Sequence, residues 1–132
     1  MFPEEIAATT VDELLVAARL QLHRLPPDAA LDAWRGGAVL VDIRSESQRA
    51  ADGEIPGATV VPRNVLEWRL DPGCTHRDPE LAQPGQRVIL ICDEGYQSSL
   101  AAATLRRFGM DATDVVGGAQ AWSAAGLPLQ FS

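Results

Sequence analysis

Long apolar runs are missing from this sequence. No stretch approaches the roughly 20 apolar residues that a membrane-spanning helix needs. The first ten residues, MFPEEIAATT, carry acidic side chains where a secretory signal carries basic ones. The composition therefore predicts a protein without a membrane segment or an export signal, and we expect it to be cytoplasmic.

Cysteine and histidine are also scarce. The two cysteines, Cys74 and Cys92, could form one disulfide, but free thiols are the expected state in a reducing compartment. The two histidines, His23 and His76, lie far apart in the chain and show no metal-ligand spacing. We expect neither a metal site nor any other cofactor.

Positive charge is in short supply. The sequence has 11 basic and 18 acidic residues, which gives a formal net charge of -7. Such a surface repels phosphate backbones and anionic lipid headgroups. We therefore exclude nucleic acid and membranes as the main partners.

The residues that are present suffice for one folded domain. The chain has 132 residues, of which 46% are hydrophobic and 22% charged, as in ordinary globular proteins. Apolar residues recur at helical spacing from Val11 to Leu25, with Thr10 as the N-cap, and two prolines then end the helix. We expect residues 1–24 to form an N-terminal helical arm and residues 25–132 to form the domain.

Beyond the arm, apolar strand patterns alternate with helical ones. Strands are predicted at residues 38–44, 58–61, 87–92 and 110–116. The runs at 38–44 and 87–92 are continuously apolar, as in strands covered on both faces of a parallel sheet. Asp28 is the expected N-cap of the first helix in the domain, and residues 74–86 are expected to form a loop with at most one turn of helix. Helices are predicted at residues 28–35, 45–53, 63–73, 98–109 and 119–129. This alternation predicts a three-layer α/β/α fold around a mainly parallel sheet.

The strand at 87–92 ends in Cys92, and the polar loop DEGYQ then leads into a helix. Ligands bind beyond the carboxyl ends of the strands in open parallel sheets, and Cys92 stands at such an end. Gly95 permits the backbone curvature that turns successive N–H groups inward as an anion-binding nest. The nest and the positive end of the following helix favour a thiolate over a thiol. The alternative that these residues leave open is a packed, inert cysteine.

Four motifs follow one another along the chain. VLVDIR ends in an Asp-x-Arg pattern, GEIPGA forms a Gly-x-Ile-Pro-Gly-Ala turn, and CDEGYQS has the spacing Cys-x-x-Gly-x-x-Ser. VVGGAQAWSAAGLP combines Gly-Gly, Trp and Gly-Leu-Pro. With the predicted strands and helices between these motifs, residues 26–129 resemble a rhodanese-like sulfurtransferase domain.

The resemblance implies a rhodanese-like fold and sulfur transfer without a cofactor. Cys92 would take a sulfane sulfur from thiosulfate, mercaptopyruvate or a persulfide and pass it to a thiol or cyanide. Backbone N–H groups of the loop would hold the negative outer sulfur of the Cys92 persulfide. The loop residues that the resemblance assigns to this site are Asp93, Glu94, Gly95, Tyr96, Gln97 and Ser98.

Two other functions compete with sulfur transfer. One is a binding module, or a persulfide relay docked to a partner protein, in which small donors do not turn over. The other is a phosphatase of the same fold, which needs a loop one residue longer, closed by an arginine that pairs with phosphate oxygens. The sixth residue after Cys92 is Ser98, so we do not expect a phosphatase.

Three charged residues are candidates for a supporting role. Asp42 and Arg44 leave a strand near the expected place of the cysteine loop, where they would orient the loop or anchor the next helix as a structural pair. Arg63 would lend positive charge to the mouth of the site or lie on a solvated face. Cys74 would be a resolving thiol, or a loop cysteine without a role.

Thiosulfate is expected to be a poor donor. Gln97 stands where many members of the family carry arginine, and Asp93 and Glu94 would repel a dianion at close range. We expect a Michaelis constant for thiosulfate above the low-millimolar range when thiocyanate formation from cyanide is measured. A constant in that range or below it would contradict the expectation.

Overall fold

The computed structural model describes residues 8–131, and its centre is a sheet of four parallel strands in the order β2-β1-β3-β4. The strands are β1 (Val39–Asp42), β2 (Thr59–Val60), β3 (Arg87–Ile91) and β4 (Asp111–Asp114). The two central strands are paired in register from Val39 with Val88 to Asp42 with Ile91. Because all strands run the same way, their carboxyl ends share one edge of the sheet.

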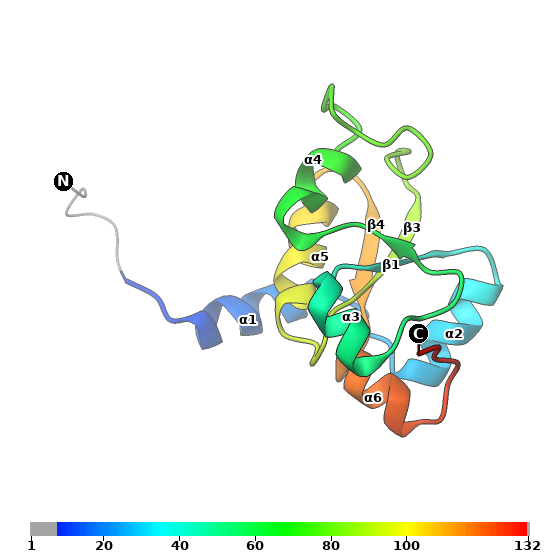
Figure 1. Ribbon diagram of the computed structural model, residues 1–132. Coiled ribbons are helices and arrows are strands. Elements are labelled where there is room, and N and C mark those ends of the chain that lie inside the picture. The colour runs from blue at the N-terminus through cyan, green and yellow to red at the C-terminus, as the bar shows by residue number, and fades with distance from the viewer. Residues whose placement is uncertain (1–7, 132) are drawn as a thin grey trace.

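Helices cover both faces of the sheet, as Figure 1 shows. The helical segments are α1 (Val11–Leu20), α2 (Pro27–Arg35), α3 (Glu46–Asp52), the 3₁₀ turn η1 (Arg63–Val65), α4 (Leu66–Leu70), α5 (Gln97–Arg107) and α6 (Gly118–Ala124). Alternate residues of β3 face opposite layers, as the period of a strand requires. Val88 and Leu90 pack in a cluster with α4 and α5, whereas Ile89 and Ile91 pack with α2 and α6. The predicted three-layer α/β/α fold is confirmed.

The first helix is shorter than the sequence pattern predicted. Thr10 is its N-cap, as expected, and accepts a hydrogen bond from the Glu13 amide at 3.1 Å. The helix ends at Leu20 instead of reaching Leu25. The reason is that the Leu25 backbone pairs with the chain beyond β4: its N–H donates to the Asp114 carbonyl at 3.0 Å and its carbonyl accepts from Val116 at 2.9 Å.

The predicted cap of the second helix was also displaced. Pro26 is the N-cap and Pro27 the first helical residue, so Asp28 lies inside the first turn. Proline suits this position because its missing N–H has no partner at a helix start in any case. Residues 74–86 contain no helix or strand, as predicted.

Helix α1 packs on α5 and extends away from the body of the molecule toward its N-terminal end (Figure 1). Ala18 is buried, while Val16 and Leu20 on the outward face are 62% and 83% exposed. In the part of the chain that the structure describes, no helix is both long and apolar enough to cross a membrane.

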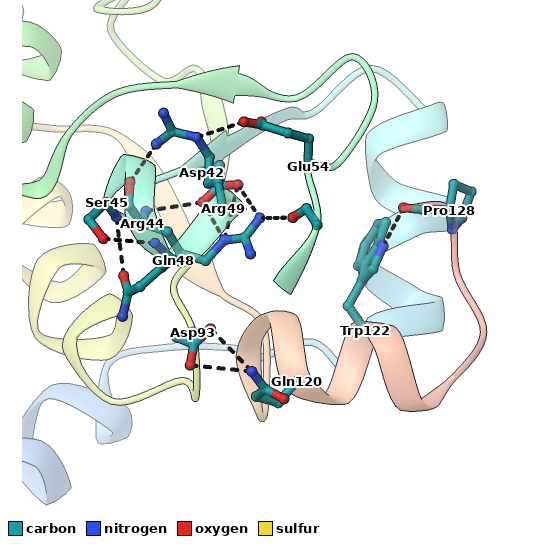
Figure 2. Close-up of polar contacts among 11 residues, drawn as sticks. Asp42, Arg44, Ser45, Gln48, Arg49, Glu54, Asp93, Gln120, Trp122 and Pro128 are labelled. Carbon is teal, nitrogen blue, oxygen red and sulfur yellow. Dashed lines mark hydrogen bonds and ion pairs between the residues drawn. The ribbon is translucent and has the colours of Figure 1, made fainter. Parts of the chain in front are cut away.

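A buried ion pair fixes the end of β1. The Arg44 guanidinium donates to the Asp42 carboxylate at 2.8 Å and to the Gly53 carbonyl at 2.8 Å, and both charged side chains are at most 1% exposed. Figure 2 shows these contacts beside α3. The pair therefore ties the carboxyl end of β1 to the turn after α3.

Removing one member of this pair is expected to destabilise the fold strongly. The Asp42→Asn variant leaves the Arg44 charge buried without its counter-ion, and we expect a loss of about 3–5 kcal/mol in the free energy of unfolding. Urea unfolding measures this. The matched control is Glu67→Gln, which breaks the half-exposed pair with Arg63 and is expected to cost about 0–1 kcal/mol. Equal losses in the two variants would contradict the assignment.

Candidate active site

The candidate site is centred on Cys92, which directly follows β3 at the carboxyl edge of the sheet. Its side chain is 2% exposed. The loop of residues 93–96 returns the chain to the start of α5 at Gln97, so the thiol lies under the N-terminal end of an 11-residue helix. That position places it near the positive end of the helix dipole.

Gly95 gives the loop its shape. It has a φ of +87°, and its N–H donates to the Cys92 sulfur at 3.1 Å. A Cβ at this position would lie 2.8 Å from the Gly117 amide nitrogen, so no side chain fits between the loop and the Gly-Gly turn. The same turn continues into α6, whose Ala119 amide donates to the Cys92 carbonyl at 2.8 Å. The cysteine loop is therefore held from its backbone by the segment that opens α6.

A chain of hydrogen bonds leads from the thiol to a buried carboxylate. The Cys92 thiol donates to Ser98 Oγ at 3.1 Å, and the Ser98 hydroxyl donates to Asp114 Oδ2 at 2.7 Å. Ser99 donates to the same oxygen at 2.7 Å. Asp114 is fully buried at the end of β4.

Sequence reasoning did not single out Asp114 or Ser99. A signal for Asp114 was present, because it is a carboxylate at the carboxyl end of the strand that follows β3 in the chain. In a parallel sheet, that end lies at the same edge as Cys92.

Two arginines from the N-terminal part of the chain reach the loop from behind. Arg19 Nη2 and Arg24 Nη2 donate to the Gly95 carbonyl at 2.8 and 3.0 Å, across 76 and 71 residues of sequence. Arg24 Nε also pairs with Asp114 Oδ1 at 2.8 Å. Neither arginine was predicted, because sequence spacing carries no information about contacts at such separations.

The thiol lies beside a cavity of about 270 Å³. Its walls are Gln48, Cys92, Asp93, Glu94, Tyr96 and Gln97. Tyr96 is 59% exposed, and Arg19 lies 5.7 Å from the centre of its ring. Gln48 and Gln97 also line a neighbouring cavity of about 230 Å³ that contains Arg63. The two cavities therefore share Gln48 and Gln97 as a common wall.

Asp93 carries the clearest electrostatic perturbation of the site. Burial raises the pKa of its carboxyl above the ordinary 3.8, and the neighbouring carboxyl of Asp52 raises it further, while a hydrogen bond from Gln120 and the charge of Arg44 lower it. Figure 2 shows the Gln120 amide directed at Asp93, with a distance of 3.3 Å to Oδ1. Negative charge on this wall of the cavity is therefore disfavoured, and an anionic ligand adds to that cost.

The other candidate residues, Asp42, Arg44 and Arg63, form their ion pairs outside the cysteine loop. Asp42 and Arg44 bond to each other and to Gly53, and Arg44 acts on the loop through its charge on Asp93. Arg63 lines the neighbouring cavity and forms an ion pair with Glu67 at 2.8 Å.

Cys74 lies apart from the site. Both cysteines are free, and Cys74 lines a groove with Phe108 at the far end of α5. The 11 residues of α5 span about 16 Å. A disulfide needs Cα atoms within about 7 Å, so Cys74 does not reach Cys92 in this arrangement. Among residues 8–131, no group of three or more His, Cys, Asp and Glu side chains is placed to hold a metal ion.

The chain is a parallel α/β domain that presents a cysteine on a glycine-containing loop between a strand and a helix, at the edge of the sheet where ligands bind in such folds. Within this class of α/β domains, the model of the rhodanese-like domain matches residues 26–125, and the chain therefore belongs to the rhodanese-like family. This confirms the resemblance carried by the four sequence motifs.

Solved structures agree with this assignment. A protein of unknown function from Rhodopseudomonas palustris CGA009, described as a possible tyrosine phosphatase, is 29% identical, with a TM-score of 0.84 over 98% of this chain and 100% of that one. The polysulfide-sulfur transferase homodimer from Wolinella succinogenes is 24% identical, with a TM-score of 0.72 over 92% and 87% of the two chains. Thiosulfate sulfurtransferase from Pseudomonas aeruginosa is 28% identical, with a TM-score of 0.63 over 83% of this chain and 19% of that one. No curated protein matches the sequence.

The charge on Asp93 is expected to slow anionic donors. We expect Asp93→Asn to raise the second-order rate constant for loading Cys92 with thiosulfate about fivefold. The reason is that the variant removes a repulsion of about 1 kcal/mol between the Asp93 carboxylate and the dianion. The variant-to-wild-type ratio should approach one at low pH, where Asp93 is protonated, and grow as pH rises through its raised pKa.

The control for this ratio is Glu80→Gln, which removes one exposed charge from the loop of residues 74–86. Its ratio should stay near one at every pH. A ratio for Asp93→Asn that does not change with pH would contradict the role given to this carboxylate.

Proposed function

We propose that the protein is a sulfurtransferase in which Cys92 carries the transferred sulfur as a persulfide. The observation that carries the proposal is the thiol itself: it is buried beside a cavity, receives the Gly95 N–H at 3.1 Å, and lies at the start of a helix in a rhodanese-like domain. Preorganised donors of this kind stabilise negative charge on sulfur both before and after transfer.

The reaction consists of two displacements at sulfur. The Cys92 thiolate attacks the transferable sulfur of the donor. With thiosulfate or a persulfide the donor S–S bond breaks with its electron pair, and the donor leaves as sulfite or as a thiolate. With mercaptopyruvate the C–S bond breaks instead, and pyruvate leaves as its enolate and is then protonated. The acceptor thiolate or cyanide then attacks the outer sulfur and releases the Cys92 thiolate. One sulfur atom is transferred and no external oxidant or reductant is consumed.

Ser98 is suited to respond to the charge of the thiolate. With the thiol protonated, the Ser98 hydroxyl accepts from sulfur and donates to Asp114. When sulfur is ionised, the hydroxyl is free to rotate and donate to it, because Asp114 still receives Ser99 at 2.7 Å and Arg24 at 2.8 Å. The carboxylate therefore keeps partners in both states, so the rotation leaves no buried charge unpaired.

The walls of the cavity favour some donors over others. Asp93 and Glu94 line it, and Gln97 occupies the last position before Ser98. A thiosulfate dianion meets two carboxylates there, whereas an organic persulfide brings less negative charge. We therefore propose persulfides of thiols as the better donors, with a thiol as the acceptor.

A persulfide relay docked to a partner protein is the second candidate. The observation that favours it is Tyr96, which forms part of the cavity wall and is 59% exposed beside the thiol. A large exposed aromatic side chain is typical of contact surfaces between proteins. A protein-borne persulfide would then load Cys92 much faster than small donors do.

Phosphatase chemistry is not favoured, although the protein from Rhodopseudomonas palustris is described as a possible tyrosine phosphatase. The loop from Cys92 to Ser98 contains no arginine, and two of its side chains are carboxylates. Bidentate binding of phosphate depends on a guanidinium group. We expect no hydrolysis of p-nitrophenyl phosphate.

Intact mass spectrometry tests the proposed function. The reduced protein is exposed in turn to thiosulfate, mercaptopyruvate and glutathione persulfide, and then to cyanide. We expect an adduct of one sulfur atom that is absent from Cys92→Ser, present in the control Cys74→Ser, and removed by cyanide. The absence of an adduct with every donor, including a protein-borne persulfide, would leave only the binding-module function.

A further inference from the structure

Two charged donors and one hydroxyl group surround the carbonyl oxygen of Gly95. Arg19 Nη2 lies 2.8 Å from the oxygen, Arg24 Nη2 lies 3.0 Å from it, and the Ser99 hydroxyl is at 3.4 Å. Both arginines precede residue 26, where the match to the family begins. Neither side chain lines the cavity in front of Cys92, so neither is placed to touch a donor molecule there.

We propose that Arg19 and Arg24 are positioning residues for sulfur transfer, which direct the Tyr96 N–H into the cavity by holding the Gly95 carbonyl on the opposite side. This inference rests on the proposed function. The Gly95–Tyr96 peptide is trans, and in a planar trans peptide the C=O and N–H bonds point in opposite directions. Fixing the oxygen behind the loop therefore fixes the hydrogen in front of it.

The Tyr96 amide is available for this purpose. Tyr96 lines the cavity, and within residues 8–131 its N–H has no hydrogen bond to another group of the protein. Together with the Gly95 N–H, which already points at the Cys92 sulfur, it gives two adjacent backbone donors. Two such donors suit a persulfide, whose outer sulfur carries the negative charge.

The guanidinium geometry matters as much as the charge. Arg19 uses a second nitrogen, Nε, to donate to Ser99 Oγ at 3.1 Å, and Arg24 pairs with both oxygens of Asp114 at 2.8 and 3.1 Å. Each arginine therefore has a second anchor that fixes the direction from which it reaches the carbonyl of Gly95. A lysine ammonium lacks this planar fork.

A purely structural role for these arginines makes a different prediction. If they only attach α1 to the body, removing one lowers stability and leaves the folded enzyme as fast as before. If they position the loop, the folded variant loads sulfur slowly, while reactions at Cys92 that form no persulfide are spared. The two roles are therefore separated by comparing two reactions of the same thiol.

The experiment uses the full chain and Arg19, because removing Arg24 leaves the buried Asp114 carboxylate without its counter-ion and endangers folding. Arg19→Ala, Arg19→Lys and wild type are loaded with saturating glutathione persulfide, well below their unfolding temperatures, and the one-sulfur adduct is followed by mass spectrometry. Alkylation of Cys92 by iodoacetamide is measured in parallel. The control is Arg107→Ala, an exposed arginine at the far end of α5.

We expect Arg19→Ala to load about tenfold more slowly than wild type, as for the loss of a charge-assisted hydrogen bond. Arg19→Lys should recover part of that loss, alkylation should change less than threefold, and Arg107→Ala should match wild type. Equal loading by Arg19→Ala and wild type, or equal slowing of loading and alkylation, would overturn the proposal. A wild-type protein that no donor loads would instead overturn the proposed function on which it rests.

Discussion

The arrangement around Cys92 depends on one buried charge, the carboxylate of Asp114. It accepts hydrogen bonds from Arg24, Ser98 and Ser99 and has no exposure to solvent. Burying an ion raises the free energy of the folded state by several kcal/mol unless charged and polar partners are fixed around it. Those partners come from the N-terminal segment and from the first turn of α5. The bonds to this one carboxylate therefore set the positions of α5, of Ser98 beside the thiol and of Arg24 behind the loop.

A second constraint acts from the other side of the loop. A side chain at Gly95 has no room because its Cβ would lie 2.8 Å from the Gly117 nitrogen, and α6 binds the loop through its first amides. The loop is thus enclosed between the Gly-Gly turn and the arginines, and only its outer residues face the cavity. Those outer residues include two carboxylates, which places acidic groups in front of the thiol and cationic groups behind it. The two carboxylates disfavour anions that approach from solvent.

The sequence predicted those parts of the molecule that local patterns determine. Continuous apolar runs located β1 and β3, and the position of Cys92 at the end of β3 followed from the strand pattern and the motif spacing. The helix that follows the N-cap Thr10 was predicted too long, because the helical spacing of apolar residues does not reveal that Leu25 pairs with the segment after β4. Arg19 and Arg24 were missed for the same reason: their contacts cross 71 to 90 residues of chain, and nothing local marks an arginine as a partner of a distant carbonyl.

The residues that match the family model do not include all the residues that contact the cysteine loop. Residues 26–125 contain all the loop and the sheet that supports it, yet both guanidinium groups behind Gly95 come from residues before that boundary. A recombinant fragment that begins at residue 26 would retain all four motifs and lose the two cations that bind the loop from behind. For this protein, the domain defined by sequence comparison and the unit defined by physical contact with the cysteine loop are different pieces of the chain.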